Sequence, residues 1–473
     1  MPSTELLIVN ADVGVGPLQQ IAVGKGRSGA SVVTGISSEL DTAPGVVIDA
    51  DGCAVITGIV DHHVHLFAMA AAMSSVTCGP PTVHDRTSLH DALAHAEPDD
   101  GGWIRGVGYV ETVAGDLTRE ALDAMTGFRP TRVQHRSGAL WMLNTAAIDA
   151  TGLAQSDHPG IERSARGEPT GRLWRADSWL RSRLPPTGPP DLAAVGRVLA
   201  DHGITEITDA TPDLDDDAIG LIKDAVSDGT VPQRVLLLGA PLTDRPAGST
   251  ARISFGPYKI VLADSALVHP DALASRIKAA HAVGRSVAIH SVSYAALAIA
   301  LAAWGDVGVR AGDRIEHAGM VSPDAIAEIS SAGLIVVTQP GFLPHRGDDF
   351  LDVSDDGDHN DLYRCGSLIA AGVPVALSSD APYGPIDPWN NIAAAVHRRT
   401  ATGRTVGASD DRISALDALA LYQKPARNPG GHAQRIAIGQ RADLVVLDRP
   451  MRDVLADPSR TAAVATIIDG RRV

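Results

Sequence analysis

The chain has 473 residues, 44% of them hydrophobic, so it can bury one large core with a smaller satellite domain. Its formal net charge of -16 at pH 7 argues against nucleic-acid and anionic-membrane partners, because both bind clustered lysine and arginine. The three widely spaced cysteines give no disulfide framework, and no run approaches the roughly 18 apolar residues of a membrane span. The start, MPSTELLIVNADV, also lacks the basic and apolar segments of a secretory signal. We therefore expect a cytoplasmic protein that acts on a small molecule, with no nucleic-acid or membrane partner.

Both ends of the chain are rich in short β-type runs. Residues 1–56 contain ELLIVNADV and GVVIDADG, and residues 430–473 contain QRIAIGQRADLVVLD and AVATIIDGRRV, with glycine and aspartate at the breaks. The residues between them alternate strand and helix patterns. This order predicts a small β-sandwich domain built from both termini, 1–56 and 430–473, beside an α/β domain at 57–429.

Eight apolar runs that end in polar residues lie in this middle region. In chain order they are VITGIVDHH, ITEITDAT, QRVLLLG, YKIVLAD, SVAIHS, RIEHAG, LIVVTQP and VPVALSSDAP. Alanine-rich helical patterns such as DALASRIKAAHAVG and PDAIAEISSAG lie between several of them, each closing with a glycine typical of a helix C-cap. Eight such units predict an α/β fold of the (β/α)8, TIM-like barrel type, whose site lies at the C-terminal ends of its strands.

The stretch 67–190 interrupts this alternation directly after the first barrel strand. It is rich in proline, glycine, arginine and tryptophan, and its segments GGWIRGVGY and RVQHRSGALWMLNTAAI have ordered, amphipathic patterns. An insertion at the end of a barrel strand is placed to cover the site. We therefore predict a lid-like subdomain at 67–190.

The first run ends in GIVDHHVHL, which contains three histidines within nine residues. Residues two apart on a strand point to the same side, so His63 and His65 project together while His62 faces away. Two neighbouring imidazoles make half of a zinc site, although for this pair alone a structural role is an equal alternative.

The ends of later runs favour the metal interpretation. His290 closes the fifth run, His317 the sixth and Asp380 the eighth, and Lys259 lies within the fourth. In a barrel, these side chains converge on one mouth with the two histidines of the first strand. A separate structural explanation for each of the six is improbable.

Several motifs spread over nearly the whole chain belong together. They are DHHVHL after a terminal β segment, RIEH, SSDAP and the closing GQRADLVVLD, with GGWIRGVGY, GALWMLNTAAI and GEPTGRLWRADSWL in the insertion. In this combination the sequence resembles the amidohydrolase superfamily, and specifically its amidohydrolase-3, YtcJ-like branch. The resemblance implies a (β/α)8 barrel with a β-sandwich from both termini and one or two divalent metals, usually Zn²⁺.

The resemblance also implies roles for the residues at the strand ends. His63, His65 and Asp380 match ligands of the buried metal, and His290 and His317 match ligands of a second metal. Lys259 matches a lysine that such enzymes carboxylate at N6 with CO2 to bridge the two ions, whereas an ion-paired or solvent-facing lysine is the alternative.

The implied reaction is hydrolysis of a C–N bond in a small molecule, of the amide, N-acyl or N-formyl type. Metal-activated hydroxide attacks the carbonyl, and Asp380 serves as general base and then as general acid. A deaminase of the same fold is the nearest alternative, but deamination sites often use one metal and a glutamate, so the lysine bridge favours amide hydrolysis. A non-catalytic binding protein on the same barrel is a third alternative, which retention of all six candidate ligands disfavours.

Substrate contacts are harder to place. Tyr294 stands in HSVSY where the family usually has an acid, and Ala139 stands where it often has histidine, so substrate specificity does not transfer simply. Candidate substrate contacts are Tyr109, Tyr294 and His345, with core packing and a plain loop histidine as the alternatives for the first and the last. The sequence leaves the substrate, the identity and number of the metals, and the oligomeric state open, with a homodimer as one option.

Overall fold

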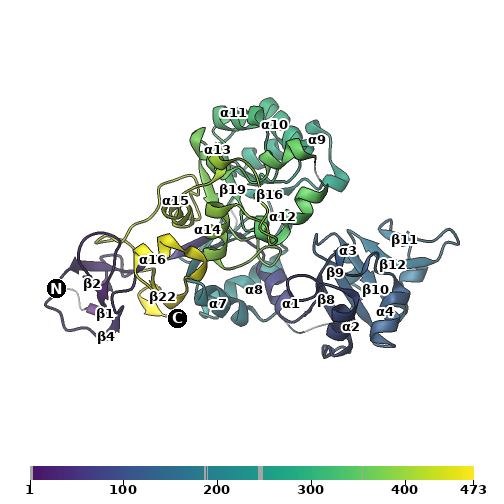
Figure 1. The fold of residues 1–473 in the computed structure, drawn as a ribbon, viewed down its shortest axis with the longest axis horizontal. Helices are drawn as coiled ribbons and strands as arrows, with labels where there is room; N and C mark the ends of the chain where they lie inside the picture. Colours follow the sequence, from purple (N-terminus) through teal and green to yellow (C-terminus); the bar gives the residue numbers. More distant parts are fainter. Residues whose placement is uncertain (1–3, 186–187, 189, 243–248, 354) are drawn as a thin grey trace. The chain divides into compact units, whose positions relative to one another are not determined.

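The computed structural model describes residues 4–185, 188, 190–242, 249–353 and 355–473. It divides into two compact units, one of Met1–Leu66 with Leu192–Val473 and the other of Phe67–Asp191, and both are drawn in Figure 1. Residues 1–3 of the predicted terminal domain and residues 186, 187 and 189 of the predicted insertion lie outside the described residues.

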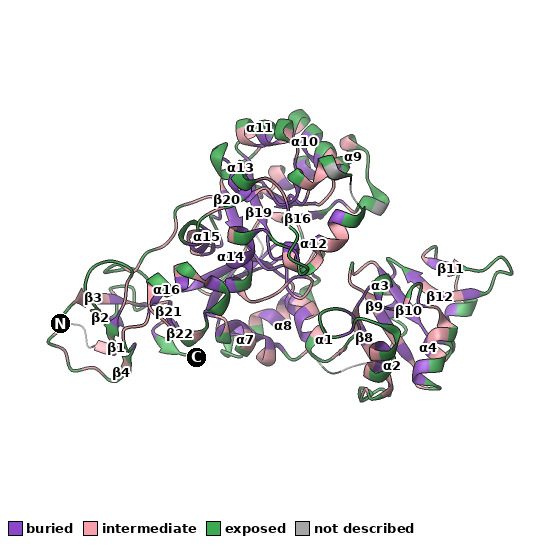
Figure 2. Cartoon of the chain, viewed as in Figure 1, coloured by how far each residue is buried: buried purple, intermediate pink, exposed green. Residues whose placement is uncertain are grey.

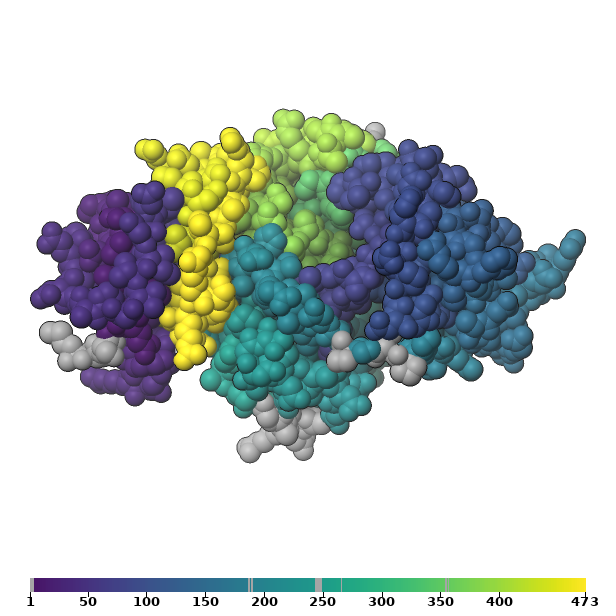
Figure 3. Space-filling view, turned by 90° about the horizontal axis from the view of Figure 1, so that it is seen from below, coloured from purple at the N-terminus to yellow at the C-terminus, as the bar shows by residue number. Residues whose placement is uncertain are grey.

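Eight strands from the two ends of the chain form two sheets of four. Their orders are β3-β2-β1-β4 and β23-β22-β21-β5. Apolar residues of both sheets, among them Ile8, Ile21 and Leu444, pack in one buried cluster, and Figure 3 shows the C-terminal residues beside the N-terminal ones. The two ends of the chain therefore share one hydrophobic core. The strands are β1 Thr4–Ala11, β2 Gln19–Lys25, β3 Ser31–Ser37, β4 Val46–Asp49, β5 Val55–Thr57, β21 Leu444–Leu447, β22 Ala463–Ile468 and β23 Arg471–Arg472.

The middle of the chain carries two parallel sheets, with the orders β15-β14-β13-β6 and β16-β17-β18-β19-β20. Each of the eight predicted runs contains one of these strands, which confirms the mixed α/β class. The strands are β6 Ile59–Val64, β13 Ile204–Asp209, β14 Arg234–Leu237, β15 Ile253–Phe255, β16 Tyr258–Val261, β17 Val287–Ser291, β18 Arg314–His317, β19 Ile335–Thr338 and β20 Val375–Leu377.

The described strands form two sheets rather than one closed barrel, and the division falls between β15, a strand that the sequence did not predict, and the fourth predicted run, which begins at Tyr258. There β15 pairs with β14 and β16 pairs with β17, and the two strands are separated by Gly256 and Pro257. Proline has no backbone N–H to donate to a ladder, so it interrupts a strand. The closed barrel stays a prediction.

Helices accompany the parallel strands. In α10, the buried residues Leu297, Ala300, Leu301 and Trp304 follow a helical period, and Figure 2 shows exposed outer faces on α9, α10 and α11. As predicted, α11 ends at Gly333, which adopts a left-handed conformation. No helix in the described part of the chain is long and apolar enough to cross a membrane. The helices of this unit are α7 Leu192–Asp201, α8 Asp216–Ser227, α9 Pro270–Ala282, α10 Tyr294–Val307, α11 Pro323–Ala332, α12 Phe342–Val353, α13 Cys365–Ala370, α14 Pro388–His397, α15 Ala415–Tyr422 and α16 Met451–Ala456.

The unit of residues 67–191 has a six-stranded sheet of its own, in the order β11-β12-β10-β9-β8-β7. Buried clusters that include Leu89 with Val133 and Leu143 with Leu173 give it a separate core. Its strands are β7 Val76–Thr77, β8 Ile104–Tyr109, β9 Thr131–His135, β10 Leu140–Leu143, β11 Ile161–Arg163 and β12 Pro169–Trp174. Its helices are α2 Arg86–Ala94, α3 Glu111–Ala114, α4 Arg119–Thr126, α5 Thr145–Thr151 and α6 Asp177–Arg181, and α1 Leu66–Met73 leads into it.

Candidate metal centre

The carboxyl end of β6 presents two histidines to one aspartate. His63 is fully buried, His65 is partly buried, and their Nε2 atoms lie 3.5 and 3.3 Å from Oδ1 of Asp380. The strand alternation that predicted a common direction for the two imidazoles therefore holds.

Backbone contacts fix Asp380 in this place. Its N–H donates to the carbonyl of His63 at 2.9 Å, and the N–H of His65 donates to the carbonyl of Ala381 at 2.9 Å. Asp380 itself has a φ of 58°, a left-handed conformation that aspartate tolerates better than most residues. The segment after β20 is thus held against β6 at the carboxylate.

Asp61 also joins β6 to the segment after β20. The buried carboxylate of Asp61 accepts from the N–H groups of His63 and Ser379, both at 3.1 Å. Burial raises the pKa of Asp61 to about 7.

The Nδ1 atoms of three histidines each face a side-chain oxygen. That of His63 contacts Oε2 of Glu316, that of His65 lies 3.3 Å from Oγ1 of Thr211, and that of His317 lies 2.9 Å from Oε1 of Gln339. The carboxylate of Glu316 and the amide oxygen of Gln339 can only accept, so the ring protons of His63 and His317 lie on Nδ1 and the lone pairs lie on Nε2. Metal-binding histidines show this arrangement, in which a second group orients the ring.

His317 and His290 extend the cluster along the neighbouring strands. The ring centroid of His317 is 4.8 Å from that of His63 and 4.4 Å from that of His290. Nε2 of His317 is buried and has no hydrogen-bond partner among the described residues. Unpaired buried nitrogen is costly, so this atom suits a bound cation.

Lys259 brings a sixth group to the cluster. Its side chain is buried, and Nζ lies 3.4 Å from Nε2 of His63. Burial is the main cause that lowers the pKa of the Lys259 amine to about 8, which brings the neutral, nucleophilic form closer to physiological pH. The structure thus brings together all six residues that the sequence singled out.

The donor set fits a divalent metal. One ligand atom from each of His63, His65 and Asp380 lies within 4.8 Å of the other two. Burial, together with neighbouring Lys259 and His290 respectively, holds the pKa values of His63 and His317 well below their usual range, so both imidazoles are neutral. Neutral imidazole lone pairs facing a carboxylate oxygen repel one another unless a cation lies between them.

Sequence reasoning missed Glu316, Gln339 and Thr211, which orient the three rings. Glu316 stood in the quoted RIEH, but regular alternation would point Glu316 and His317 to opposite faces. His317 has a φ of 71°, which ends β18 and lets both residues reach the ring of His63. Left-handed residues of this kind concentrate at functional sites, and no pattern in the sequence predicted the left-handed conformation of His317.

Two of the predicted substrate contacts form hydrogen bonds with residues outside this cluster. Tyr294, at the start of α10, donates its hydroxyl to Oδ2 of Asp361 at 2.8 Å. His345 is an exposed residue of α12 rather than a loop residue. Tyr109 is buried in the core of residues 67–191, where its hydroxyl donates to the Gly115 carbonyl at 2.6 Å. A role in substrate binding stays a prediction for all three.

The sequence was compared with known protein families. A family model described as "Amidohydrolase family" matches residues 46–473. The chain belongs to the amidohydrolase family. This membership confirms the predicted superfamily and identifies the chain as a hydrolase of C–N bonds.

Two curated relatives cover most of this amidohydrolase. The N-substituted formamide deformylase of Arthrobacter pascens is 27% identical, and the match covers 98% of this chain and 97% of the relative. The relative named "Putative amidohydrolase YtcJ" of Bacillus subtilis (strain 168) is 25% identical, and the match covers 85% of each chain.

Solved structures agree with the fold. The crystal structure of an uncharacterized metal-dependent hydrolase from Pyrococcus horikoshii matches with a TM-score of 0.72, 17% identity and 99% coverage of both chains. N-isopropylammelide isopropylaminohydrolase from Burkholderia multivorans matches with a TM-score of 0.52, 16% identity, and coverage of 99% of this chain and 98% of that one. At these identities the likeness shows the mixed α/β fold alone.

Proposed function

We propose that this amidohydrolase cleaves the amide bond of a small N-acyl compound, most specifically an N-formyl amine, at a divalent metal held by His63, His65 and Asp380. The observation that carries the proposal is the position of Asp380 Oδ1. It has no hydrogen-bond partner among the described residues and lies within 3.5 Å of Nε2 of both histidines. The near full-length similarity to a formamide deformylase supports the N-formyl class.

The residues divide the chemical work. A bound divalent cation polarises the scissile carbonyl and lowers the pKa of water from about 15.7 toward 7. Asp380 accepts the proton of the attacking water and returns it to the leaving amine. Glu316, Thr211 and Gln339 hold the imidazole rings in the orientation that presents Nε2 to the site.

We further propose zinc as the metal and two ions as its number. His290 and His317 would hold the second ion, and Lys259, carboxylated on Nζ, would supply an anionic ligand to both. The position of Nζ, 3.4 Å from Nε2 of His63, supports this role, because a carbamate formed there would add two oxygen ligands to the donor set. A positively charged ammonium in the same place would repel the cations.

We also propose that the two parallel sheets close into a (β/α)8 barrel. The N–H of Lys259 on β16 donates to the carbonyl of Leu238, just past β14, at 3.2 Å. On the other side, Val64 of β6 forms a parallel bridge with Ala381 beyond β20. These contacts join the sheets at both edges, and the six grouped side chains then lie at the carboxyl ends of the barrel strands.

The function is tested with a substrate panel and controlled metal content. The protein is stripped with a chelator, reloaded with Zn²⁺, and assayed on N-alkyl and N-benzyl formamides, their N-acetyl analogues and amino-substituted heterocycles. We expect equimolar formate and amine from the formamides, at a rate that follows metal content. Ammonia release from the heterocycles without formamide cleavage would support a deaminase instead. Full activity at less than about one-tenth of an ion per chain would overturn the metal-dependent mechanism.

The proposed carbamate gives a separate prediction. Stripped protein reloaded with Zn²⁺ in CO2-depleted buffer should recover little activity, and added bicarbonate should restore it, because only CO2 can convert the Lys259 amine into an anionic bridge. The measurement is turnover and bound zinc during reloading. Lys259→Met should lose the response to bicarbonate, whereas Lys278→Met, at an exposed position of α9, should keep it. Equal recovery with and without bicarbonate would show that the lysine acts uncarboxylated.

A further inference from the structure

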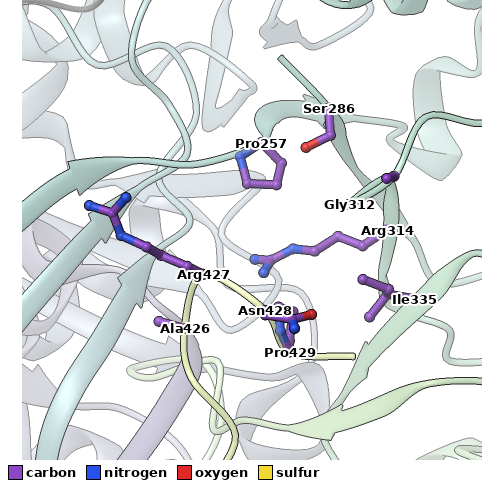
Figure 4. Close-up of a pocket in the computed structure, with 10 residues that line it drawn as sticks. Pro257, Ser286, Gly312, Arg314, Ile335, Ala426, Arg427, Asn428 and Pro429 are labelled. Atoms are coloured by element: carbon purple, nitrogen blue, oxygen red, sulfur yellow. The ribbon is translucent and has the colours of Figure 1, made fainter. Parts of the chain in front are cut away.

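A cavity lies at the amino ends of β16 to β19, whereas His290 and His317 lie at the carboxyl ends of β17 and β18. Its volume is about 260 Å³, room for roughly eight waters at about 30 Å³ each. Figure 4 shows the guanidinium of Arg314 extending between Pro257 on one side and Asn428 on the other. The mechanism proposed above makes no use of this cavity.

Arg314 lines the cavity and is buried, with 1% of its surface exposed. Nε donates to Oε1 of Glu316 at 2.5 Å, and Nη2 donates to the carbonyl of His62 at 3.4 Å. Nη1 is buried without a hydrogen-bond partner in the part of the chain that the structure describes. The two contacts that are made hold the guanidinium in place, so Nη1 cannot turn to another protein acceptor.

An unpaired buried donor costs about 1–3 kcal/mol, and more when the group is charged. The Nη1 side of a guanidinium offers two N–H donors, and with the free N–H of Nη2 it can hold both oxygens of a carboxylate in a bidentate pair. The Arg314 guanidinium therefore lacks one hydrogen-bond acceptor, and a planar carboxylate would supply it.

The rest of the lining favours a negative ligand with access from solvent. Arg427 adds a second positive charge, and none of the lining residues that the structure describes is acidic. Ala311, Arg427 and Asn428 are exposed, so the cavity opens to the surface beside them. Long-range attraction from the exposed Arg427 raises the local concentration of anions.

We propose that this cavity is a binding site for a small carboxylate, held by Arg314 and attracted by Arg427. The site is distinct from the metal centre, since it uses the opposite ends of the strands. The carboxylate would accept hydrogen bonds from Nη1 of Arg314, and the ion pair between Arg314 and Glu316 would stay intact.

The test is equilibrium dialysis of the metal-loaded protein with [¹⁴C]formate at constant ionic strength. We expect saturable binding that Arg314→Gln weakens roughly tenfold or more and Arg427→Ala weakens about two- to fivefold, the range of an exposed charge. Arg412→Ala, at an exposed arginine that does not line the cavity, should bind as the unaltered protein does.

A further variant covers the case in which Arg314→Gln fails to fold. Ser286 lines the cavity from the loop before β17, so Ser286→Leu reduces the cavity volume without removing a charge. This variant should also weaken formate binding. Unchanged binding in Ser286→Leu and Arg427→Ala, or absence of saturable binding in the unaltered protein, would overturn the proposal. Formate bound only at the metal centre would appear as binding that these variants do not alter.

Discussion

Asp380→Asn is expected to fold and keep most of its metal while turnover falls by roughly 10²–10⁴-fold, the loss typical of removing a general base. The amide keeps an oxygen that can still face Nε2 of His63 and His65, and the backbone contacts that hold residue 380 do not involve its side chain. The basic carboxylate, however, is gone. The measurement is kcat and metal content on the purified variant.

Other variants separate the two tasks assigned to Asp380. Asp380→Ala should lose turnover similarly with a larger loss of metal, and His63→Ala should chiefly deplete metal. Asp324→Asn, at an exposed position of α11, is the matched control and should behave as the unaltered protein does. Near-native turnover in Asp380→Asn would mean that another group moves the proton.

Much of the fold was predictable because its strands are buried parallel strands, which appear as short continuous apolar runs. Each predicted run contains a strand, and the polar residues that close the runs mark the edge where the side chains gather. Strand β15 was not predicted, because the fourth run was taken to begin at Tyr258 and the three residues Ile253–Phe255 are too short an apolar run to stand out.

The ligand candidates were predictable for the same reason, since each closes or occupies a strand. The groups that orient them were not. Glu316 meets His63 across 253 positions of sequence, and Gln339 meets His317 across 22. Such contacts depend on how strands are paired and on the left-handed backbone of His317, neither of which a local pattern encodes. Glutamate, glutamine and threonine near strand ends are also too common to single out.

Glu316→Gln should weaken zinc binding by roughly 10- to 100-fold, the usual effect of losing a group that orients a metal ligand. The carboxylate accepts from Nε of Arg314 through Oε1 and from Nδ1 of His63 through Oε2. An amide has only one oxygen, so its NH2 must face one of these two donors. Either the ring of His63 loses its acceptor or the buried Arg314 loses its charge partner.

The readout is zinc affinity from competition with a chromogenic chelator, with the unfolding midpoint measured in parallel. Removing one partner of a buried charge pair costs about 3–5 kcal/mol, so Glu316→Asp, which keeps the charge on a shorter side chain, guards against loss of the fold. Its zinc affinity should lie between those of the unaltered protein and Glu316→Gln. Glu328→Gln, exposed on α11, is the matched control. Native zinc affinity in a folded Glu316→Gln variant would show that His63 binds the metal without this support.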